Sequence, residues 1–210
     1  MFGSLLFVAA GTTRWPAAWA YLLISAVQLA AYTAIVVRVH PDLIQERTHP
    51  PADAKRWDKP LVGIIGVAGP LAFILVSAFD RRFGWSGPMP TGLEVVGLAL
   101  VAAGGVIVNA AVLANRFFSA LVRIQRDRGH HVIDRGPYRV VRHPGYVASI
   151  MNSLGAPMAL GSWWAVLVGS IISAVIVVRT AMEDRTLRGE LEGYQAYASR
   201  VRFRLVPGIW

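Results

Sequence analysis

Long runs of apolar residues alternate with shorter polar and charged segments along this chain. We interpret these runs as about five membrane-spanning helices, at residues 16–38, 60–80, 91–114, 145–160 and 162–179. Most of these runs are close in length to a membrane-spanning helix, which needs about 20 residues to cross the hydrocarbon core of a bilayer. The pattern therefore predicts an all-α, multi-pass membrane protein.

The composition supports this fold class and excludes several kinds of chemistry. Of the 210 residues, 55% are hydrophobic and 16% are charged, whereas soluble domains carry roughly 25% charged residues. There is no cysteine, so disulfides, thiolate catalysis and cysteine-ligated metal sites are excluded. We expect one membrane domain over residues 1–210, with no bound metal.

The positive charges predict the orientation of the chain in the membrane. The formal net charge is +9, and 18 of the 21 Lys and Arg residues fall in three segments on one side of the predicted spans. These segments are 38–59, 116–142 and 179–204. Because Lys and Arg concentrate on the cytosolic side, we expect the N-terminus outside and the C-terminus in the cytosol. This distribution favours contact with membrane lipids and argues against a nucleic-acid partner.

Three connecting segments have patterns of their own. Residues 1–10 lack the basic start of a signal peptide, so we expect an interfacial lead-in to the first span. Residues 40–59 combine three prolines with mixed charge, which favours irregular structure. Residues 115–128 place aromatic and aliphatic side chains between arginines, which is typical of an amphipathic helix on a membrane surface.

Small and polar residues also occur inside the spans. Gly63, Gly66 and Gly69 precede Pro70, and we favour close helix packing with a proline kink over a phosphate-binding loop. No strand precedes these glycines, as a dinucleotide-binding fingerprint would require. Asn109 lies deep in the third span. Such a side chain contacts substrate or forms an interhelical hydrogen bond, and both interpretations stay open.

The last two spans are separated only by Gly161 and Ser162, so we expect an antiparallel helical hairpin. Its two cytosolic ends then lie side by side. One end carries residues 142–146 and the other carries residues 179–183. Two charged motifs that are distant in the sequence are therefore expected to converge at one place.

The polar groups of these motifs suit a cofactor that carries opposite charges and a ring. Arg142 and His143 can bind a carboxylate, and an arginine can do so with two parallel hydrogen bonds. Glu183 can accept hydrogen bonds from an ammonium or a hydroxyl group. Tyr138 and Tyr146 can form walls whose ring faces attract a cation.

Simpler interpretations of the same residues stay open. Arg179 and Glu183 stand four residues apart on one helical face, where an ordinary ion pair contributes about 0.2–0.5 kcal/mol. Arg142 and His143 can anchor the chain to lipid headgroups. Anchoring does not explain why Pro144 follows His143, at a position where proline fixes the backbone as a helix begins.

Taken together, the motifs of residues 115–210 resemble the isoprenylcysteine carboxyl methyltransferase family of integral membrane enzymes. The wider group includes phospholipid methyltransferases, and these enzymes use S-adenosylmethionine. The matching elements, in order, are His130–Ile133, Gly136-Pro137-Tyr138, Arg142–Tyr146, Arg179–Leu187, Tyr194–Tyr197 and Pro207. Asp184 stands where the family has a second Glu.

The resemblance implies roles for single residues. Arg179 is tied to substrate and catalysis, and Glu183 to cofactor binding and catalysis. Eukaryotic relatives carry basic residues in the membrane helix before the motifs, where this chain has only Asn109 as a candidate substrate contact. Together with the chemistry of Arg142, the resemblance implies that the cofactor is bound by His130, His131, Val132, Ile133, Tyr138, Arg142, His143, Pro144, Gly145, Tyr146 and Glu183.

The resemblance further implies transfer of a methyl group from S-adenosylmethionine to a lipophilic acceptor at the cytosolic membrane face. The acceptor would be an isoprenylcysteine carboxylate, another lipid or a thiol. Residues 1–114 would select it, and residues 115–210 would bind the cofactor. Two other functions stay open, namely an NADPH-dependent sterol or steroid reductase of similar C-terminal architecture and a non-catalytic membrane protein.

Overall fold

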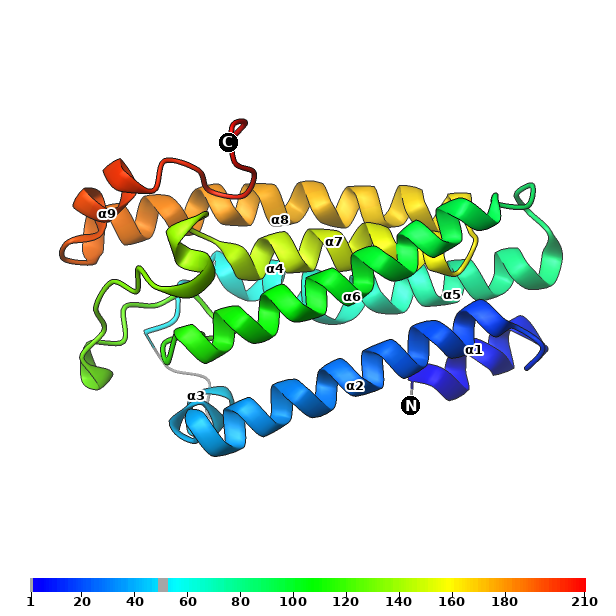
Figure 1. Ribbon diagram of the computed structural model, residues 1–210, viewed down its shortest axis with the longest axis horizontal. Coiled ribbons are helices and arrows are strands. Elements are labelled where there is room, and N and C mark those ends of the chain that lie inside the picture. The colour runs from blue at the N-terminus through cyan, green and yellow to red at the C-terminus, as the bar shows by residue number, and fades with distance from the viewer. Residues whose placement is uncertain (1, 49–52) are drawn as a thin grey trace.

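The computed structural model describes residues 2–48 and 53–210, and all the regular structure in them is helical (Figure 1). Four of the described helices are long and apolar enough to cross a membrane: α2 (Pro16–Val39), the combined helix Asp58–Phe83, α6 (Thr91–Ala114) and α8 (Trp163–Glu190). The remaining expected span forms α7 (Pro144–Ala159), a shorter helix of 16 residues. The prediction of an all-α, multi-pass membrane protein is confirmed, with four long spans in place of about five.

The helices α7 and α8 form the expected antiparallel hairpin (Figure 1). Gly161 lies in the turn between them with a φ of +71°, a backbone conformation that favours glycine. The Ser162 hydroxyl oxygen caps α8 by accepting a hydrogen bond from the Ala165 N–H (3.1 Å). The same hydroxyl donates to Asp80 (2.5 Å), a buried carboxylate near the end of α5 (Gly69–Phe83). The turn is therefore fixed on both sides.

Small residues bring the backbones of α6, α7 and α8 close together. A Cβ atom at Gly97 of α6 would overlap the backbone of α7 at Gly155 and Ala159. A Cβ atom at Gly169 of α8 would overlap the carbonyl group of Ser153 on α7. Small residues are the usual means by which membrane helices approach one another. Here they hold the second half of α7 close to α6 and to the first turns of α8.

The glycine-rich part of the second span is a continuous helix. This agrees with the favoured prediction of helix packing and not with a phosphate-binding loop. Helix α4 (Asp58–Gly63) runs into a π-helical turn, η1 (Ile64–Ala68), and then into α5. In this turn the Gly69 N–H donates to the Ile64 carbonyl, five residues earlier. Pro70 follows directly, and a widened turn accommodates a residue that cannot continue the regular hydrogen-bond ladder. Gly69 also packs closely against α8.

Two segments before the second span are helical. The lead-in forms α1 (Phe2–Ala10), whose Leu6 is buried in one hydrophobic cluster with Phe73 of α5. Residues 40–59 were expected to be irregular, but they contain a helix, α3 (Asp42–Thr48). Two of the prolines behind that expectation, Pro50 and Pro51, lie outside the described residues.

The prediction of an amphipathic helix over residues 115–128 is wrong. The chain there is not α-helical, and its only regular element in the described structure is a 3₁₀ turn, η2 (Arg126–Arg128). Asn115 ends α6, and its side-chain oxygen accepts a hydrogen bond from the Phe117 N–H (2.8 Å). The Gln125 side chain in turn donates to the Phe117 carbonyl (2.8 Å). These side-chain contacts replace the backbone ladder that a helix would need.

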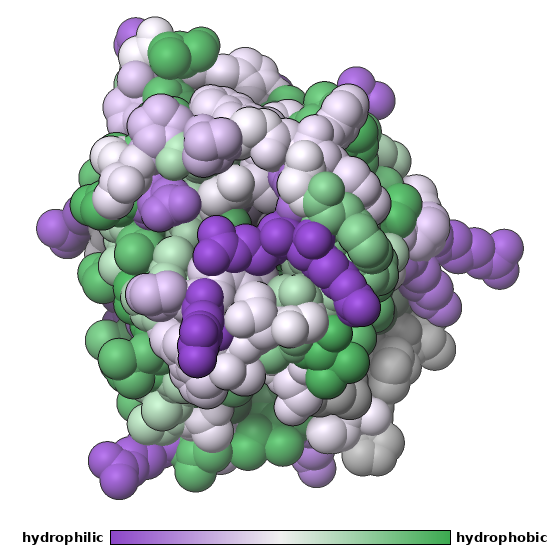
Figure 2. Space-filling view, turned by 90° about the vertical axis from the view of Figure 1, so that its right-hand side faces the viewer, coloured by the Kyte–Doolittle hydropathy of each residue, from purple (hydrophilic) through white to green (hydrophobic). Residues whose placement is uncertain are grey.

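The sides and ends of the bundle differ in polarity. Exposed apolar side chains such as Leu23 and Ile171 lie on the sides, which suits contact with lipid tails. Figure 2 looks onto the end that carries the α5–α6 and α7–α8 connections, where hydrophilic side chains stand among pale and hydrophobic ones. The opposite end carries α3, α9 (Tyr194–Arg200) and residues 115–143 (Figure 1).

Candidate functional site

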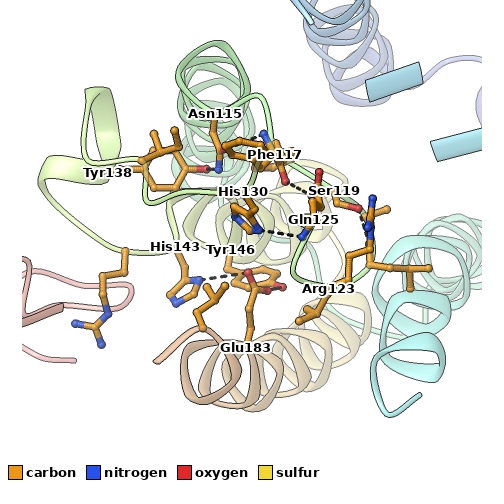
Figure 3. A pocket seen from close by; sticks show the side chains of 18 of the residues that line it. Asn115, Phe117, Ser119, Arg123, Gln125, His130, Tyr138, His143, Tyr146 and Glu183 are labelled. Atoms are coloured by element: carbon orange, nitrogen blue, oxygen red, sulfur yellow. Dashed lines mark hydrogen bonds and ion pairs between the residues drawn. The ribbon is translucent and has the colours of Figure 1, made fainter. Parts of the chain in front are cut away.

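A cavity of about 380 Å³ lies at the end of the bundle that carries α3 and α9 (Figure 3). Its polar wall comes from residues 115–133, the start of α7 and the last turns of α8. Its apolar wall includes Tyr32 of α2, Ile65 and Gly66 of η1, and Val108 of α6. The volume is in the usual range of small-molecule sites, and both halves of the chain contribute to it.

Nearly all residues that the sequence indicates for the site line this cavity. They are His130, His131, Val132, Ile133, Tyr138, Arg142, His143, Gly145, Tyr146, Arg179 and Glu183. Pro144 does not line it, because it is buried at the first position of α7, where its ring fixes the start of the helix. Asn109 does not line it either, since it points about 100° away from its lining neighbour Val108 on the same helix.

Within the part of the chain that the structure describes, the side-chain oxygen of Asn109 does not form the interhelical hydrogen bond that one interpretation expects. The Oδ1 atom is buried and has no hydrogen-bond partner among the described residues, so the expected interhelical hydrogen bond to this atom is absent there. A role of Asn109 in substrate binding stays a prediction.

The two motifs of the hairpin meet at the floor of the cavity, as expected (Figure 3). The Tyr146 hydroxyl donates a hydrogen bond to Glu183 Oε2, and His143 Nδ1 lies 3.9 Å from Glu183 Oε1. The rings of His143 and Tyr146 stack with their centroids 5.7 Å apart. The Arg179 guanidinium lies over the Tyr146 ring, 5.2 Å from its centroid. A carboxylate, two rings and a cation thus come together in one place.

Arg179 does not form the ordinary ion pair with Glu183 that its spacing allows. Its Nε atom lies 2.6 Å from Asp58 Oδ1, and its Nη2 atom lies 2.9 Å from Asp58 Oδ2. The Nη2 atom also donates to the Ala120 carbonyl (2.7 Å). Asp58 is fully buried at the start of α4. Because Arg179 pairs with Asp58, the Glu183 carboxylate is available to other partners.

Asp184, the neighbour of Glu183, is the centre of a second charge cluster. Its fully buried carboxylate accepts hydrogen bonds from Arg142 (2.7 Å), Arg188 (3.0 Å) and Arg204 (2.9 Å). The Tyr194 hydroxyl donates to the same carboxylate at 3.1 Å. Asp184 therefore joins α8 to the segment before α7, to α9 and to the chain that follows α9.

Arg142 is largely occupied inside the protein. Besides its contacts with Asp184, its Nη1 atom donates to the carbonyls of Val201 and Arg202, each at 2.7 Å. Four of its five N–H groups are thus bonded to other parts of the chain. In this structure Arg142 holds segments together, and binding of a cofactor carboxylate by it stays a prediction.

The wall opposite the hairpin is formed by the extended segment after α6. Asn115 donates from its side chain to the Tyr138 hydroxyl (3.1 Å), and the Gln125 N–H donates to His130 Nδ1 (3.3 Å) (Figure 3). Because Nδ1 accepts, the proton of neutral His130 lies on Nε2. Burial, with the nearby charges of His131 and Arg123, lowers the pKa of His130 to about 4. His130 is therefore neutral at physiological pH.

Two further features of this wall bear on ligand binding. The main-chain N–H groups of Val132 and Ile133 have no hydrogen-bond partner among the described residues, so they can donate to the edge of a ring. Arg123 is a cation at the cavity, but it is paired with Glu46 (2.6 Å) and Asp127 (2.8 Å). Its charge is therefore already balanced.

Several residues of the site were missed by the sequence analysis. Asn115, Phe117, Gln125, Tyr194 and Tyr197 line the cavity without a predicted role. The spacing of the two tyrosines was part of the motif pattern, and it could have indicated their place. No sequence signal connects Asp58 with Arg179, because the two are 121 residues apart.

Comparisons with known proteins show what this chain is similar to. Residues 93–191 match the family model described as phospholipid methyltransferase. A probable protein-S-isoprenylcysteine O-methyltransferase of Oryza sativa subsp. indica is 39% identical over 69 residues, which is 32% of this chain and 36% of that protein. Protein-S-isoprenylcysteine O-methyltransferase A of Arabidopsis thaliana is 32% identical over 84 residues, 40% of this chain and 41% of that protein.

A relative from Schizosaccharomyces pombe, protein-S-isoprenylcysteine O-methyltransferase, is 36% identical over 64 residues, 30% of this chain and 27% of that protein. The chain thus matches well under half of the length of each of these curated relatives. The matches confirm the resemblance to isoprenylcysteine carboxyl methyltransferases and related phospholipid methyltransferases. The residues that the family model matches include both hairpin motifs and the cavity wall of residues 115–133, whereas α1 to α5 lie before them.

Proposed function

We propose that this chain is a membrane methyltransferase that uses S-adenosylmethionine and methylates a lipophilic acceptor at the cytosolic membrane face. The observation that carries the proposal is the cavity in which Glu183, Tyr146 and residues 130–133 meet. This cavity lies mainly within the segment that resembles methyltransferases. The excess of Lys and Arg at the same end of the bundle supports a cytosolic site, with the N-terminus outside.

The residues at the cavity fit the chemical groups of S-adenosylmethionine. Glu183 is partly exposed, and among the described residues its Oε1 atom has no partner closer than His143 at 3.9 Å, so it can accept hydrogen bonds from an ammonium group. The Tyr146 and His143 rings line the cavity, where they can contact a sulfonium cation. The free N–H groups of Val132 and Ile133 suit the edge of an adenine ring. When bound, the cofactor would supply an electrophilic methyl group.

The chain's own residues would then bind and align the acceptor. Arg179 lines the cavity beside Tyr146 and can orient an anionic group of the acceptor by hydrogen bonds. Enclosure in a cavity limits water around the reacting groups. Alignment alone supplies about 7–11 kcal/mol in favourable intramolecular models, so positioning can supply much of the rate.

A lipophilic acceptor is supported by the apolar wall of the cavity. The names of the relatives point to an isoprenylcysteine carboxylate as the first candidate, and another lipid as the second. Tyr32 and Gly66 line the cavity from α2 and η1, and Gly66 is exposed. We propose that an apolar chain enters here from the lipid, between these two helices.

Replacing Gly66 with Leu is expected to lower turnover of a long-chain acceptor about tenfold, with a smaller effect on a short-chain one. A Cβ atom at Gly66 would meet no atom within 4 Å, so the new side chain would project into the opening. The measurement is the initial rate of methyl transfer to farnesylated and to short S-alkyl cysteine derivatives.

Gly63 provides a matched control on the same span. A Cβ atom there also meets nothing within 4 Å, but Gly63 does not line the cavity. Gly63→Leu should keep the rates with both acceptors, and equal losses in the two variants would argue against entry at Gly66.

Replacing Glu183 with Gln is expected to weaken binding of S-adenosylhomocysteine at least tenfold, because a hydrogen bond to a charged group contributes about 1.5–3 kcal/mol. Glutamine can still accept the Tyr146 hydrogen bond, so the change mainly removes the charge. Calorimetric titration of S-adenosylhomocysteine into purified, folded protein measures the difference.

Glu190→Gln is the matched control for this titration. Glu190 lies on the same helix, pairs with Lys55 (2.7 Å) and does not line the cavity. Its replacement should leave the affinity unchanged. Absence of binding to folded wild-type protein would overturn the proposed cofactor.

A further inference from the structure

We infer that Asp58 is a positioning residue for the methyl acceptor: it orients Arg179 so that the free edge of the guanidinium binds a carboxylate of the acceptor. The inference rests on the proposed function and names the chemistry of the acceptor group. Asp58 belongs to α4, in the half of the chain that the family model does not match.

The contact between Asp58 and Arg179 is bidentate and buried. The two N–O distances are 2.6 and 2.9 Å, and the side chains are 0% and 9% exposed. Two parallel hydrogen bonds fix the plane of a guanidinium as well as its position. Asp58 Oδ2 also accepts from the Val122 N–H (2.7 Å), so the same carboxylate holds a segment of the cavity wall.

The remaining contacts of Arg179 leave one side of the guanidinium free. Its Nε atom and its Nη2 atom are used by Asp58 and the Ala120 carbonyl. The Nη1 atom has no hydrogen-bond partner among the described residues, and Arg179 lines the cavity. One face of the group is covered by the Tyr146 ring. The two N–H groups of Nη1 are thus the donors that a ligand can reach.

Charge favours a carboxylate as that ligand. Asp58 balances the charge of Arg179, so the pair as a whole is neutral and has little long-range attraction for a dianion. Its free N–H groups still bind an oxygen anion by directed hydrogen bonds. Glu183, the other acid nearby, already accepts from Tyr146 and does not bond to Arg179. A singly charged carboxylate on the acceptor fits this arrangement.

Removal of the Asp58 charge should therefore misplace the Arg179 guanidinium but should not abolish binding of the cofactor. Misplacement of a catalytic contact by about 1 Å costs up to about 100-fold in rate. Asp58→Asn keeps an oxygen that can accept from the Val122 N–H, but it loses the bidentate contact. We expect turnover to fall at least about tenfold, with S-adenosylhomocysteine affinity within about threefold of wild type.

The experiment uses the full chain in detergent with two probes, N-acetyl-S-farnesylcysteine and its uncharged amide. Wild-type protein should bind the carboxylate more tightly than the amide, and Asp58→Asn should lose most of this preference. A role in folding alone would not change the preference. Asp58→Glu, which keeps the charge, should regain part of the turnover and provides the readout if Asp58→Asn does not fold.

Asp80→Asn is the control, because Asp80 is also a buried carboxylate of the second span but bonds to serines at the other end. It should keep the preference for the carboxylate. Unchanged turnover in folded Asp58→Asn, or equal losses of turnover and cofactor affinity, would overturn the inference. So would wild-type protein that binds S-adenosylhomocysteine but does not prefer the carboxylate. Wild-type protein that binds no S-adenosylhomocysteine would instead refute the proposed function.

Discussion

Replacing Asp184 with Ala is expected to destabilise the folded protein by about 3–5 kcal/mol, the usual cost of removing one partner from a buried ion pair. Asp184 is fully buried and accepts hydrogen bonds from Arg142, Arg188 and Arg204. Without its carboxylate, the Arg142 cation stays buried with only carbonyl partners. Thermal unfolding in a mild detergent, followed by circular dichroism, measures the effect.

The matched control is Arg188→Ala, which removes the most exposed partner of the same carboxylate. Arg188 lies one turn further along α8, and its side chain is 44% exposed. A pair of this kind contributes about 0–1 kcal/mol, so the control should unfold close to the wild-type temperature. Similar losses in the two variants would show that burial of Asp184 does not govern the stability of this region.

Replacing Arg179 with Ala is expected to reduce turnover about 100- to 1,000-fold while S-adenosylhomocysteine affinity stays within about threefold, as for the loss of one donor that stabilises the reacting group. The cofactor contacts that we propose lie on Glu183, on the rings of His143 and Tyr146, and on residues 130–133, so they stay in place. Rates of methyl transfer, combined with calorimetric titration of the same samples, measure the two effects separately.

This variant also leaves Asp58 buried without a cation, which destabilises the fold. The double variant Arg179→Met with Asp58→Asn removes both charges and should recover stability but not turnover. Recovery of turnover in the double variant would contradict a direct role of Arg179. Equal losses of turnover and cofactor affinity in Arg179→Ala would contradict it as well.

Much of the helix layout follows from local signals. The first and third long spans, 16–39 and 91–114, begin at or beside Pro16 and Pro90, where a proline suits the start of a helix. Because the predicted last two spans are joined only by the short connection Gly161-Ser162, an antiparallel hairpin and the convergence of its motifs could be derived without a structure.

Residues 115–128 show where local pattern fails. Apolar and basic residues there repeat much as in a surface helix, but the Arg123 side chain is buried against Glu46, and the Val122 N–H donates to Asp58. Tertiary contacts therefore override the local preference. The partner of Arg179 was missed for the same reason, because spacing along a helix indicates Glu183 and carries no information about Asp58.

Glu183 and Asp184 illustrate what adjacency on a helix can and cannot predict. Neighbouring residues of a helix point about 100° apart, so the two acids must face different surroundings. In the structure the Glu183 side chain lines the cavity, whereas the Asp184 carboxylate pairs with the buried Arg142. Only the packing of the segments around α8 decides which acid has which role.

The Asp184 cluster also has a consequence for the order in which the protein matures. Residues 201–204 supply Arg204, two carbonyls for the Arg142 guanidinium, and backbone acceptors for the N–H groups of Arg142 and His143. These residues leave the ribosome after α8, which is the last of the four long apolar helices in the described structure. The hairpin can therefore be in the membrane while Arg142 still lacks these partners. Completion of the site is a late step of biosynthesis, separate from insertion of the helices.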